Sequence, residues 1–287
     1  MRVELDSVDL YDDIEGFLRS GKVDLVSFMD HTPGQGQYRD LLVFGDTLKG
    51  YRDVSDEEVR AIVRQQQESE KLTYAQITAL ASVARERGVS IASHDDDSED
   101  KLAFMDGLEA TISEFPISLD IARAARARGM HTIAGAPNVM LGHSHSGNLS
   151  AREAVQAGAI DVLCSDYYPA ALLDAVFTLR DQCGLDIAKA FALVTINPAK
   201  AAGIADEVGS IAVGKRADVL LVREISCGSC GSSCDGAART MPVVTRAFVG
   251  GRSVFRSHYP DQPCGYGRDT EQLVSLEQLS RPLVEAV

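Results

Sequence analysis

Short apolar runs that end abruptly in polar side chains recur along the first two thirds of the chain. In the clearest case, the run Val89–Ala92 is followed by Ser93, His94 and the three aspartates at 95–97. A short apolar run rich in β-branched residues is typical of a buried strand. Because α/β barrels place their chemistry at the carboxyl ends of their strands, this junction is predicted to belong to a functional site. The alternative for His94 alone is a surface turn, where acidic neighbours are common.

Five further runs have the same form. We predict strands that end at Glu4, His31, Glu114, Asn138 and Asp166. Segments with helical spacing lie between the runs, and this alternation favours a parallel sheet covered by helices. The ends of parallel strands meet on one face, so these residues are expected to be neighbours. The predicted fold class is therefore α/β, a TIM-type (β/α)8 barrel with about six of its eight strands, and an open sheet is the alternative.

The pattern also predicts local elements around that face. Ser55–Glu58 has the form of a capping box that opens a helix. Residues 32–38 are predicted to be a polar loop, and the strand to Asn138 is predicted to end in a loop that holds His143 and His145. Two more helices are predicted around 169–183 and 187–202.

The character of the sequence changes after Gly203. We predict a barrel portion at 1–205, a small β portion with a hairpin at 206–256, and a polar tail at 257–287. Three cysteines lie in a Gly/Ser-rich loop of the β portion, and with Cys264 they could hold a metal ion. An insertion loop with incidental thiols is the preferred interpretation for these cysteines, which are Cys227, Cys230 and Cys234.

Composition narrows the classes of function. Hydrophobic residues make up 45% and charged residues 24% of the chain, which is ordinary for a globular protein. The net charge of −14 argues against nucleic acid or an anionic membrane surface as the main partner. No apolar run approaches the roughly 18 residues of a membrane span, and the start of the chain lacks the pattern of a secretory signal. Six scattered cysteines do not form a disulfide framework, so a cytoplasmic protein is expected.

Motifs in the second half of the chain resemble the C-terminal part of amidohydrolase-superfamily enzymes. They are Asn197–Gly203, Gly209–Ile211, Gly214–Asp218 and Phe248–Gly251. More specific stretches resemble one family of that superfamily, the α-D-ribose 1-methylphosphonate 5-triphosphate diphosphatases of the carbon–phosphorus lyase pathway. These stretches are Met29–Gln35, Ser93–Asp96, Glu114–Pro116, Gly135–Asn138 with His143–Asn148, and Cys164–Pro169.

The resemblance implies a reaction and a site. The expected reaction is metal-dependent hydrolysis of the ribose triphosphate ester to the 5-phosphate and pyrophosphate in phosphonate catabolism. The implied cofactor is one or two divalent ions, zinc first, with manganese or iron as alternatives. The positions that match superfamily metal ligands are Glu4, His31, His94 and Asp166. Asp166 is also implied to take a proton from the attacking water, since a bare carboxylate beside a metal can do both.

Other residues receive supporting roles. Glu114 is interpreted as a catalytic base or substrate contact, with a role as metal ligand left open. The loop before Ser150 has histidines, serines and glycines that suit phosphate binding. The predicted substrate-binding residues are Asp95, Asn138, His143, His145, Ser146 and Asn148.

The sequence departs from the family at its start. The family has a first barrel strand that ends in a His-x-His or His-x-Asp pair, whereas this chain begins at what resembles the third strand. We therefore expect an N-terminally incomplete barrel, with the strands that end at Glu4 and Asp166 at its two borders, and a chain that is insoluble alone or assembles through those borders. Two other functions stay open: hydrolysis of a cyclic amide or N-acyl substrate, and a catalytically inactive chain that associates with proteins of the pathway. The expected partner is a small molecule, and a homo-oligomer is left open.

Overall fold

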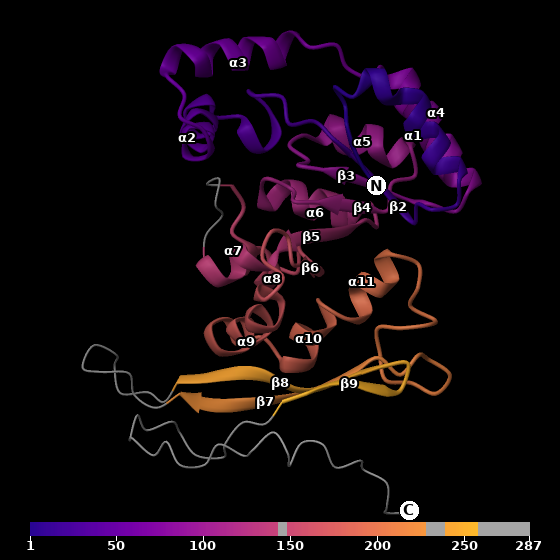
Figure 1. The fold of residues 1–287 in the computed structure, drawn as a ribbon, viewed down its shortest axis with the longest axis vertical. Coiled ribbons are helices and arrows are strands. Elements are labelled where there is room, and N and C mark those ends of the chain that lie inside the picture. Colours follow the sequence, from indigo (N-terminus) through magenta and orange to yellow (C-terminus); the bar gives the residue numbers. More distant parts are fainter. Residues whose placement is uncertain (143–147, 228–238, 258–287) are drawn as a thin grey trace, which may run out of the picture. The chain divides into compact units, whose positions relative to one another are not determined.

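The computed structural model describes residues 1–142, 148–227 and 239–257 (Figure 1). The chain divides into two compact units. The first unit consists of Met1–Val219 with Val249–Gly251, and the second of Leu220–Phe248 with the residues from Arg252. The domain bounds predicted from the sequence, with a border at residue 205, remain a prediction.

A parallel sheet of six strands forms the first unit, and its strand order follows the chain. All five neighbouring pairs are parallel. The strands are β1 (Arg2–Glu4), β2 (Leu25–Met29), β3 (Ser90–His94), β4 (Ile112–Glu114), β5 (His131–Gly135) and β6 (Val162–Cys164). This sheet confirms the prediction of six parallel barrel strands. Among the described residues β1 and β6 are its two outer strands, as expected.

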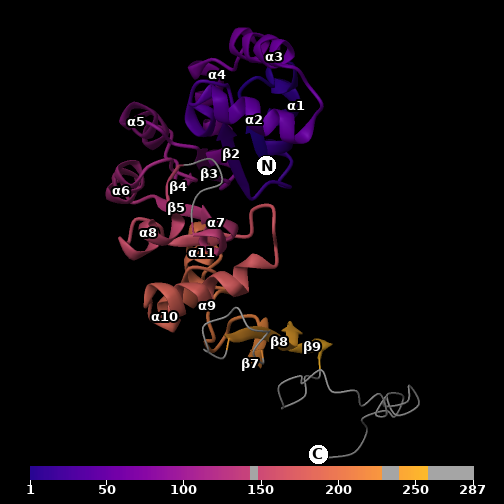
Figure 2. The same cartoon turned by 90° about the vertical axis from the view of Figure 1, so that its left-hand side faces the viewer.

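Helices follow most of the strands, and Figure 2 shows α5, α6 and α8 in succession along one side of them. The helices of the first unit are α1 (Tyr11–Arg19), α2 (Leu41–Tyr51), α3 (Asp56–Glu68), α4 (Tyr74–Glu86), α5 (Glu99–Gly107), α6 (Leu119–Ala127), α7 (Ala136–Leu141), α8 (Ala151–Gln156), α9 (Ala171–Cys183), α10 (Ile187–Ala192) and α11 (Ile196–Ala201), with 3-10 turns at Val8–Leu10 and Gly36–Tyr38. The predicted capping box at Ser55 is formed in both directions with Glu58.

Alternation along the strands sends side chains to two different cores. Val26 and Phe28 of β2 pack with helix residues such as Leu80 in one buried cluster. On the opposite face, Ala92, Ile112, Ile133 and Val162 form a smaller cluster from β3, β4, β5 and β6. The face that carries this smaller cluster also carries the strand-end residues His94 and Glu114, two positions beyond Ala92 and Ile112. The smaller apolar cluster thus lies next to the site residues on the same face of the sheet.

Two local predictions were wrong. The strand at Asn138 was expected to lead into a loop, but it ends at Gly135 and α7 begins at once, with Pro137 in the first turn, where a missing N–H costs nothing. The helix expected over 187–202 is two helices, because Thr195 leaves the helical region with φ −130° and ψ −89°. The sequence pattern also gave no sign of α2, whose two glycines weaken its helical propensity.

The second unit contains a three-stranded sheet in the order β7 (Val219–Cys227), β8 (Arg239–Val249), β9 (Arg252–Arg256). Gly250 and Gly251 join β8 to β9 with φ of 56° and 78°, which confirms the predicted glycine hairpin. Cys230, Cys234, Cys264 and nearly all of the predicted tail lie outside the described residues. Within the described part of the chain, the helices are all too short or too polar to cross a membrane.

A half-buried carboxylate ties β5 to β6 at their amino ends, away from the strand ends that carry the predicted site. Asp161 lies 2.8 Å from His131 Nδ1, accepts a 2.9 Å bond from Arg126, and accepts the backbone N–H of Thr132 at 2.8 Å. Its own carbonyl oxygen accepts a bond from the side chain of Asn197 at 2.8 Å. Burial alone would raise the pKa of Asp161, but the bonds from His131 and Thr132 and the charge of Arg126 hold that pKa below its ordinary value.

Replacing Asp161 by alanine should lower the free energy of unfolding by about 1–3 kcal/mol at neutral pH, because its donors lose a half-buried acceptor. Since the folded chain holds fewer protons on this group, its contribution is present above the ordinary pKa of 3.8 and is lost as the pH falls below it. Urea unfolding near neutral pH and at about pH 3 should therefore show a smaller deficit in acid. The matched control is Asp120→Ala, whose carboxylate on α6 is exposed. An equal loss of stability in both variants would contradict this role.

Candidate metal centre

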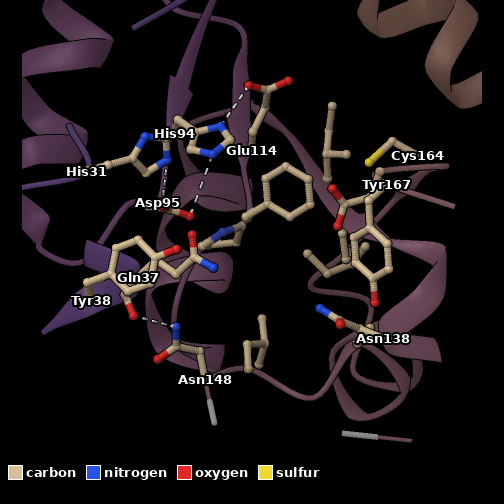
Figure 3. Close-up of a pocket in the computed structure, with 18 of the residues that line it drawn as sticks. His31, Gln37, Tyr38, His94, Asp95, Glu114, Asn138, Asn148, Cys164 and Tyr167 are labelled. Carbon is tan, nitrogen blue, oxygen red and sulfur yellow. Dashed lines mark hydrogen bonds and ion pairs between the residues drawn. The ribbon is translucent and has the colours of Figure 1, made fainter. Parts of the chain in front are cut away.

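The carboxyl ends of the strands surround a pocket of about 550 Å³ (Figure 3). Strand pairing sets His94 of β3 directly beside Glu114 of β4. Seven residues predicted for the site lie close to one another here, as expected. His31, His94, Asp95, Glu114, Asn138, Asn148 and Asp166 all line the pocket. Glu4 lines a smaller neighbouring hollow together with His31, while His143, His145 and Ser146 lie outside the described residues.

Two imidazole rings face one buried carboxylate. The rings of His31 and His94 meet edge to face, with centroids 5.3 Å apart and an interplanar angle of 83°. Nε2 of His31 lies 3.6 Å from Asp95 Oδ2, and Nε2 of His94 lies 3.8 Å from Asp95 Oδ1. One ligand atom from each of the three residues lies within 4.8 Å of the others, and within the described ranges this is the one such group of three His, Cys, Asp or Glu residues.

The Nδ1 atom of each histidine lies within hydrogen-bond distance of a glutamate. Glu4 lies 2.8 and 3.0 Å from Nδ1 of His31 through its two oxygens. Glu114 lies 3.1 Å from Nδ1 of His94 and accepts a 2.5 Å bond from the Ser27 hydroxyl. A carboxylate on Nδ1 keeps the ring proton there, so the lone pair of Nε2 points to the opposite side. Both lone pairs are thereby directed towards Asp95.

The carboxylate of Asp95 is the electrostatic anomaly of the pocket. The residue is 4% exposed, and its Oδ2 is buried with no hydrogen-bond partner among the described residues. Burial raises the pKa of Asp95, against the charges of His94 and His31. Its φ of 50° lies in the left-handed region, which few residues other than glycine adopt. An unsatisfied buried carboxylate is costly unless a cation neutralises it.

Glu114 and His31 have pKa shifts that fit this arrangement. The bond to Glu4 raises the pKa of His31, against burial. Burial would raise the pKa of Glu114, but its bonds to His94 and Ser27 hold that pKa below its ordinary value. Two imidazole nitrogens and a carboxylate oxygen are the donor set of many zinc sites with one open position. The three residues can therefore hold a divalent metal ion.

The three consecutive aspartates have three different environments. Asp95 faces the histidines, whereas Asp96 is 0% exposed and accepts bonds from the hydroxyls of Ser93 and Ser113. The third, Asp97, accepts the backbone N–H of Gly36 at 3.0 Å and so fixes the loop after β2. A single carboxylate of the cluster thus reaches the pocket.

Asp166 follows β6 and lines the pocket outside the group of three. Its φ is 51°, as in Asp95, and a Cβ on Gly135 would lie 2.9 Å from its Oδ2. A glycine at the end of β5 therefore leaves the room that this carboxylate occupies. Burial raises the pKa of Asp166, against the positive charge of Arg2. A raised pKa makes a carboxylate a stronger base near neutral pH.

Sequence reasoning missed Arg2. Its Nη2 lies 3.5 Å from Nε2 of His94, and its Nε donates to the sulfur of Met29 at 2.9 Å. It is the one Lys or Arg side chain among the described residues that line the pocket. Alternation along β1 was the available signal, because Arg2 and Glu4 share one face of that strand.

Other polar and aromatic side chains also line the pocket. Tyr38 and Tyr51 line it from the segment after β2, and Tyr167 lines it from the segment after β6. Figure 3 shows Asn138 beside Tyr167, across the pocket from His31. The side-chain amide of Asn148 lies 3.5 Å from the carbonyl oxygen of Gln37.

Comparison with known proteins places this site in a family context. Residues 51–254 match the sequence profile of the amidohydrolase family. The chain is 39% identical over 215 residues to the α-D-ribose 1-methylphosphonate 5-triphosphate diphosphatase of Escherichia coli K12, a match that covers 72% of this chain and 55% of the relative. It is 38% identical over 87 residues to a dihydroorotase of Methanopyrus kandleri, a match that covers 24% of this chain and 20% of the relative.

A solved D-hydantoinase structure has a TM-score of 0.57 with 13% sequence identity, over 89% of this chain and 69% of that one. At this identity the likeness concerns the fold alone. The chain spans about half the length of the Escherichia coli relative, 55%.

The unsatisfied oxygen of Asp95 predicts a gain in stability on substitution. In protein treated with a chelator, Asp95→Asn should raise the free energy of unfolding by about 1–3 kcal/mol, because an amide carries no buried charge and can donate to an imidazole nitrogen. Asparagine also tolerates the left-handed backbone. Urea unfolding in excess chelator measures the change, with Asp97→Asn as the control because that carboxylate already has a donor in Gly36. A lower free energy of unfolding in Asp95→Asn would contradict the view that the unpaired oxygen destabilises the folded chain.

Proposed function

The chain belongs to the amidohydrolase family, and from that premise we propose that it is a metal-dependent diphosphatase. Its proposed substrate is α-D-ribose 1-methylphosphonate 5-triphosphate, which it cleaves to the 5-phosphate and pyrophosphate. The observation that carries this proposal is the 39% identity over 215 residues to the Escherichia coli diphosphatase. The group formed by His31, His94 and Asp95 supports it with a donor set for the metal that such a hydrolysis requires.

We propose that one divalent ion, zinc in the first instance, is held by His31, His94 and Asp95. This changes three assignments made from the sequence. Asp166 was assigned as a metal ligand, but it lies outside the group of three. Glu4 was assigned as a metal ligand, but its contact with Nδ1 of His31 favours a role in orienting that ring. Asp95 was assigned to the substrate, but its buried carboxylate between the two Nε2 atoms favours a role as ligand. When bound, the ion would lower the pKa of a coordinated water towards about 7 and neutralise phosphoryl oxygens.

The remaining polar residues are proposed to bind substrate and move the proton. Asp166 would accept the proton of the attacking water, aided by the burial that raises the pKa of its carboxyl group. Glu114 would keep the proton of His94 on Nδ1, so we propose a positioning role for it. Asn138 and Asn148 offer amide donors on the pocket wall, and Arg2 offers the one guanidinium for a phosphate chain. A metal ion on Nε2 of His94 would require the Arg2 side chain to turn towards the substrate.

Loss of His94 tests the metal centre. His94→Ala should remove bound metal and lower pyrophosphate release by more than the roughly 10–100-fold that loss of a supporting residue costs. The overall fold should persist, since His94 lies at a strand end rather than in the apolar clusters. His131→Gln is the matched control, because that histidine lies at the opposite end of its strand, beside Asp161. Metal content by elemental analysis and a colorimetric pyrophosphate assay measure the two effects.

Unchanged metal content and turnover in His94→Ala would refute the site. The same preparations should be offered dihydroorotate and a panel of N-acyl substrates, since one partial relative is a dihydroorotase. Metal-dependent hydrolysis of these compounds without pyrophosphate release from the ribose ester would keep the metal centre and refute the substrate.

A further inference from the structure

A lysine on α5 donates hydrogen bonds to the backbone of His94 and Asp95. Lys101 lies in the first turn of this helix, where its backbone N–H is accepted by the N-cap Ser98. Its Nζ donates to the carbonyl oxygen of His94 at 2.6 Å and to the carbonyl oxygen of Asp95 at 3.2 Å. Lys101 does not appear among the residues that line the pocket. It therefore acts on the backbone of these two residues and not on the contents of the site.

These hydrogen bonds lie at the point where the chain leaves β3. Asp95 adopts φ 50°, a conformation that is unfavourable for residues other than glycine and persists only where its surroundings enforce it. Its N–H donates to the carbonyl oxygen of Glu114 at 2.8 Å, while its carbonyl oxygen faces Lys101. Both ends of the strained residue are thus fixed. In a regular extended strand, side chains 94 and 95 would point to opposite faces, whereas here both face His31.

A buried charge holds the lysine in turn. The carboxylate of Asp96 is 0% exposed, and one of its oxygens lies 4.0 Å from Lys101 Nζ. Ser93 and Ser113 donate their hydroxyls to Asp96 from adjacent strands. Neutral hydroxyls alone are a poor environment for a buried carboxylate, so the ammonium group supplies the opposite charge. Asp96 in this way anchors Lys101 to the outer side of β3 and β4.

Resting on the metal centre proposed above, we propose that Lys101, anchored by Asp96, is a positioning residue for that centre. It holds the turn at Asp95 in its left-handed form, so that His94 Nε2 and the Asp95 carboxylate already face His31 before a metal ion binds. Lys101 touches neither metal nor substrate. Its loss weakens the affinity for the ion by leaving the ligands less well organised, in the range of about 10–100-fold seen for supporting residues of metal sites.

The experiment separates this role from simple charge balance. Lys101→Met removes the hydrogen bonds to the carbonyl oxygens of His94 and Asp95 and leaves Asp96 without its counter-charge. The double variant Asp96→Asn with Lys101→Met removes both charges and keeps an amide that can meet the two serines. Lys189→Met is the matched control, an exposed lysine on α10. For each variant, the Kd for Zn²⁺ is measured by competition with a chromophoric chelator, and urea unfolding is measured in excess chelator.

We expect Lys101→Met to raise the Kd for Zn²⁺ about 10–100-fold and to lower the urea midpoint. The double variant should recover most of the urea midpoint while the Kd stays high, and Lys189→Met should match the wild type in both. A wild-type Kd in Lys101→Met would overturn the proposal. So would recovery of both quantities in the double variant, because Lys101 would then serve only the charge of Asp96.

Failure of the proposed function would look different. If the wild type binds Zn²⁺ no more tightly than His94→Ala, the metal centre itself is refuted and the role of Lys101 with it. If the wild type binds the ion tightly through His94 and Lys101→Met does so equally, only the role of Lys101 is refuted. Amide hydrogen exchange gives a further readout that needs no metal: the Asp95 N–H should exchange faster in Lys101→Met than in the wild type and in Lys189→Met.

Discussion

A buried carboxylate that is not satisfied by hydrogen bonds is the constraint on which the site depends. Asp95 lies between the Nε2 atoms of His31 and His94, and its Oδ2 finds no partner among the described residues. A folded protein tolerates such a group only if a favourable interaction offsets the free energy lost on desolvation. Glu4 and Glu114 hold the proton of each imidazole on the far side of the ring, so the near side offers lone pairs to a cation. The three residues thus offer a donor set that could hold a metal ion, with both rings already oriented.

The sheet separates this costly site from the contacts that stabilise the fold. The carboxyl ends of the strands carry the pocket, and the residues that follow three of them, Asp95, Phe115 and Asp166, adopt positive φ. At the amino ends, Asp161 has a full set of donors from His131, Arg126 and Thr132. Between the two ends lies an apolar layer. Strain and unsatisfied charge thus gather where chemistry is expected, and satisfied polar groups gather at the opposite end.

Much of this organisation follows from local sequence. Apolar runs of β-branched residues predicted the six strands, and the polar residues at their ends predicted the face on which the pocket lies. Ser55 and Glu58 predicted a helix start because a capping box needs only residues three apart. The same reasoning failed at Gly135, where an apolar run continues from a strand into α7 without a change in hydrophobicity. Of the three adjacent aspartates, it assigned Asp95 to the substrate and gave the other two no role in the site.

The sequence by itself determined that His31, His94 and a set of carboxylates meet at the strand ends, because parallel strands bring those ends together. Only the tertiary structure decided which carboxylate does what. Asp95 enters the pocket because its backbone turns into the left-handed region, and Asp96 turns away to the serines of two strands. Glu4 supports a ring because the pairing of β1 with β2 brings it to His31. These outcomes depend on single dihedral angles and on contacts between distant segments, which a periodic pattern along the chain does not encode.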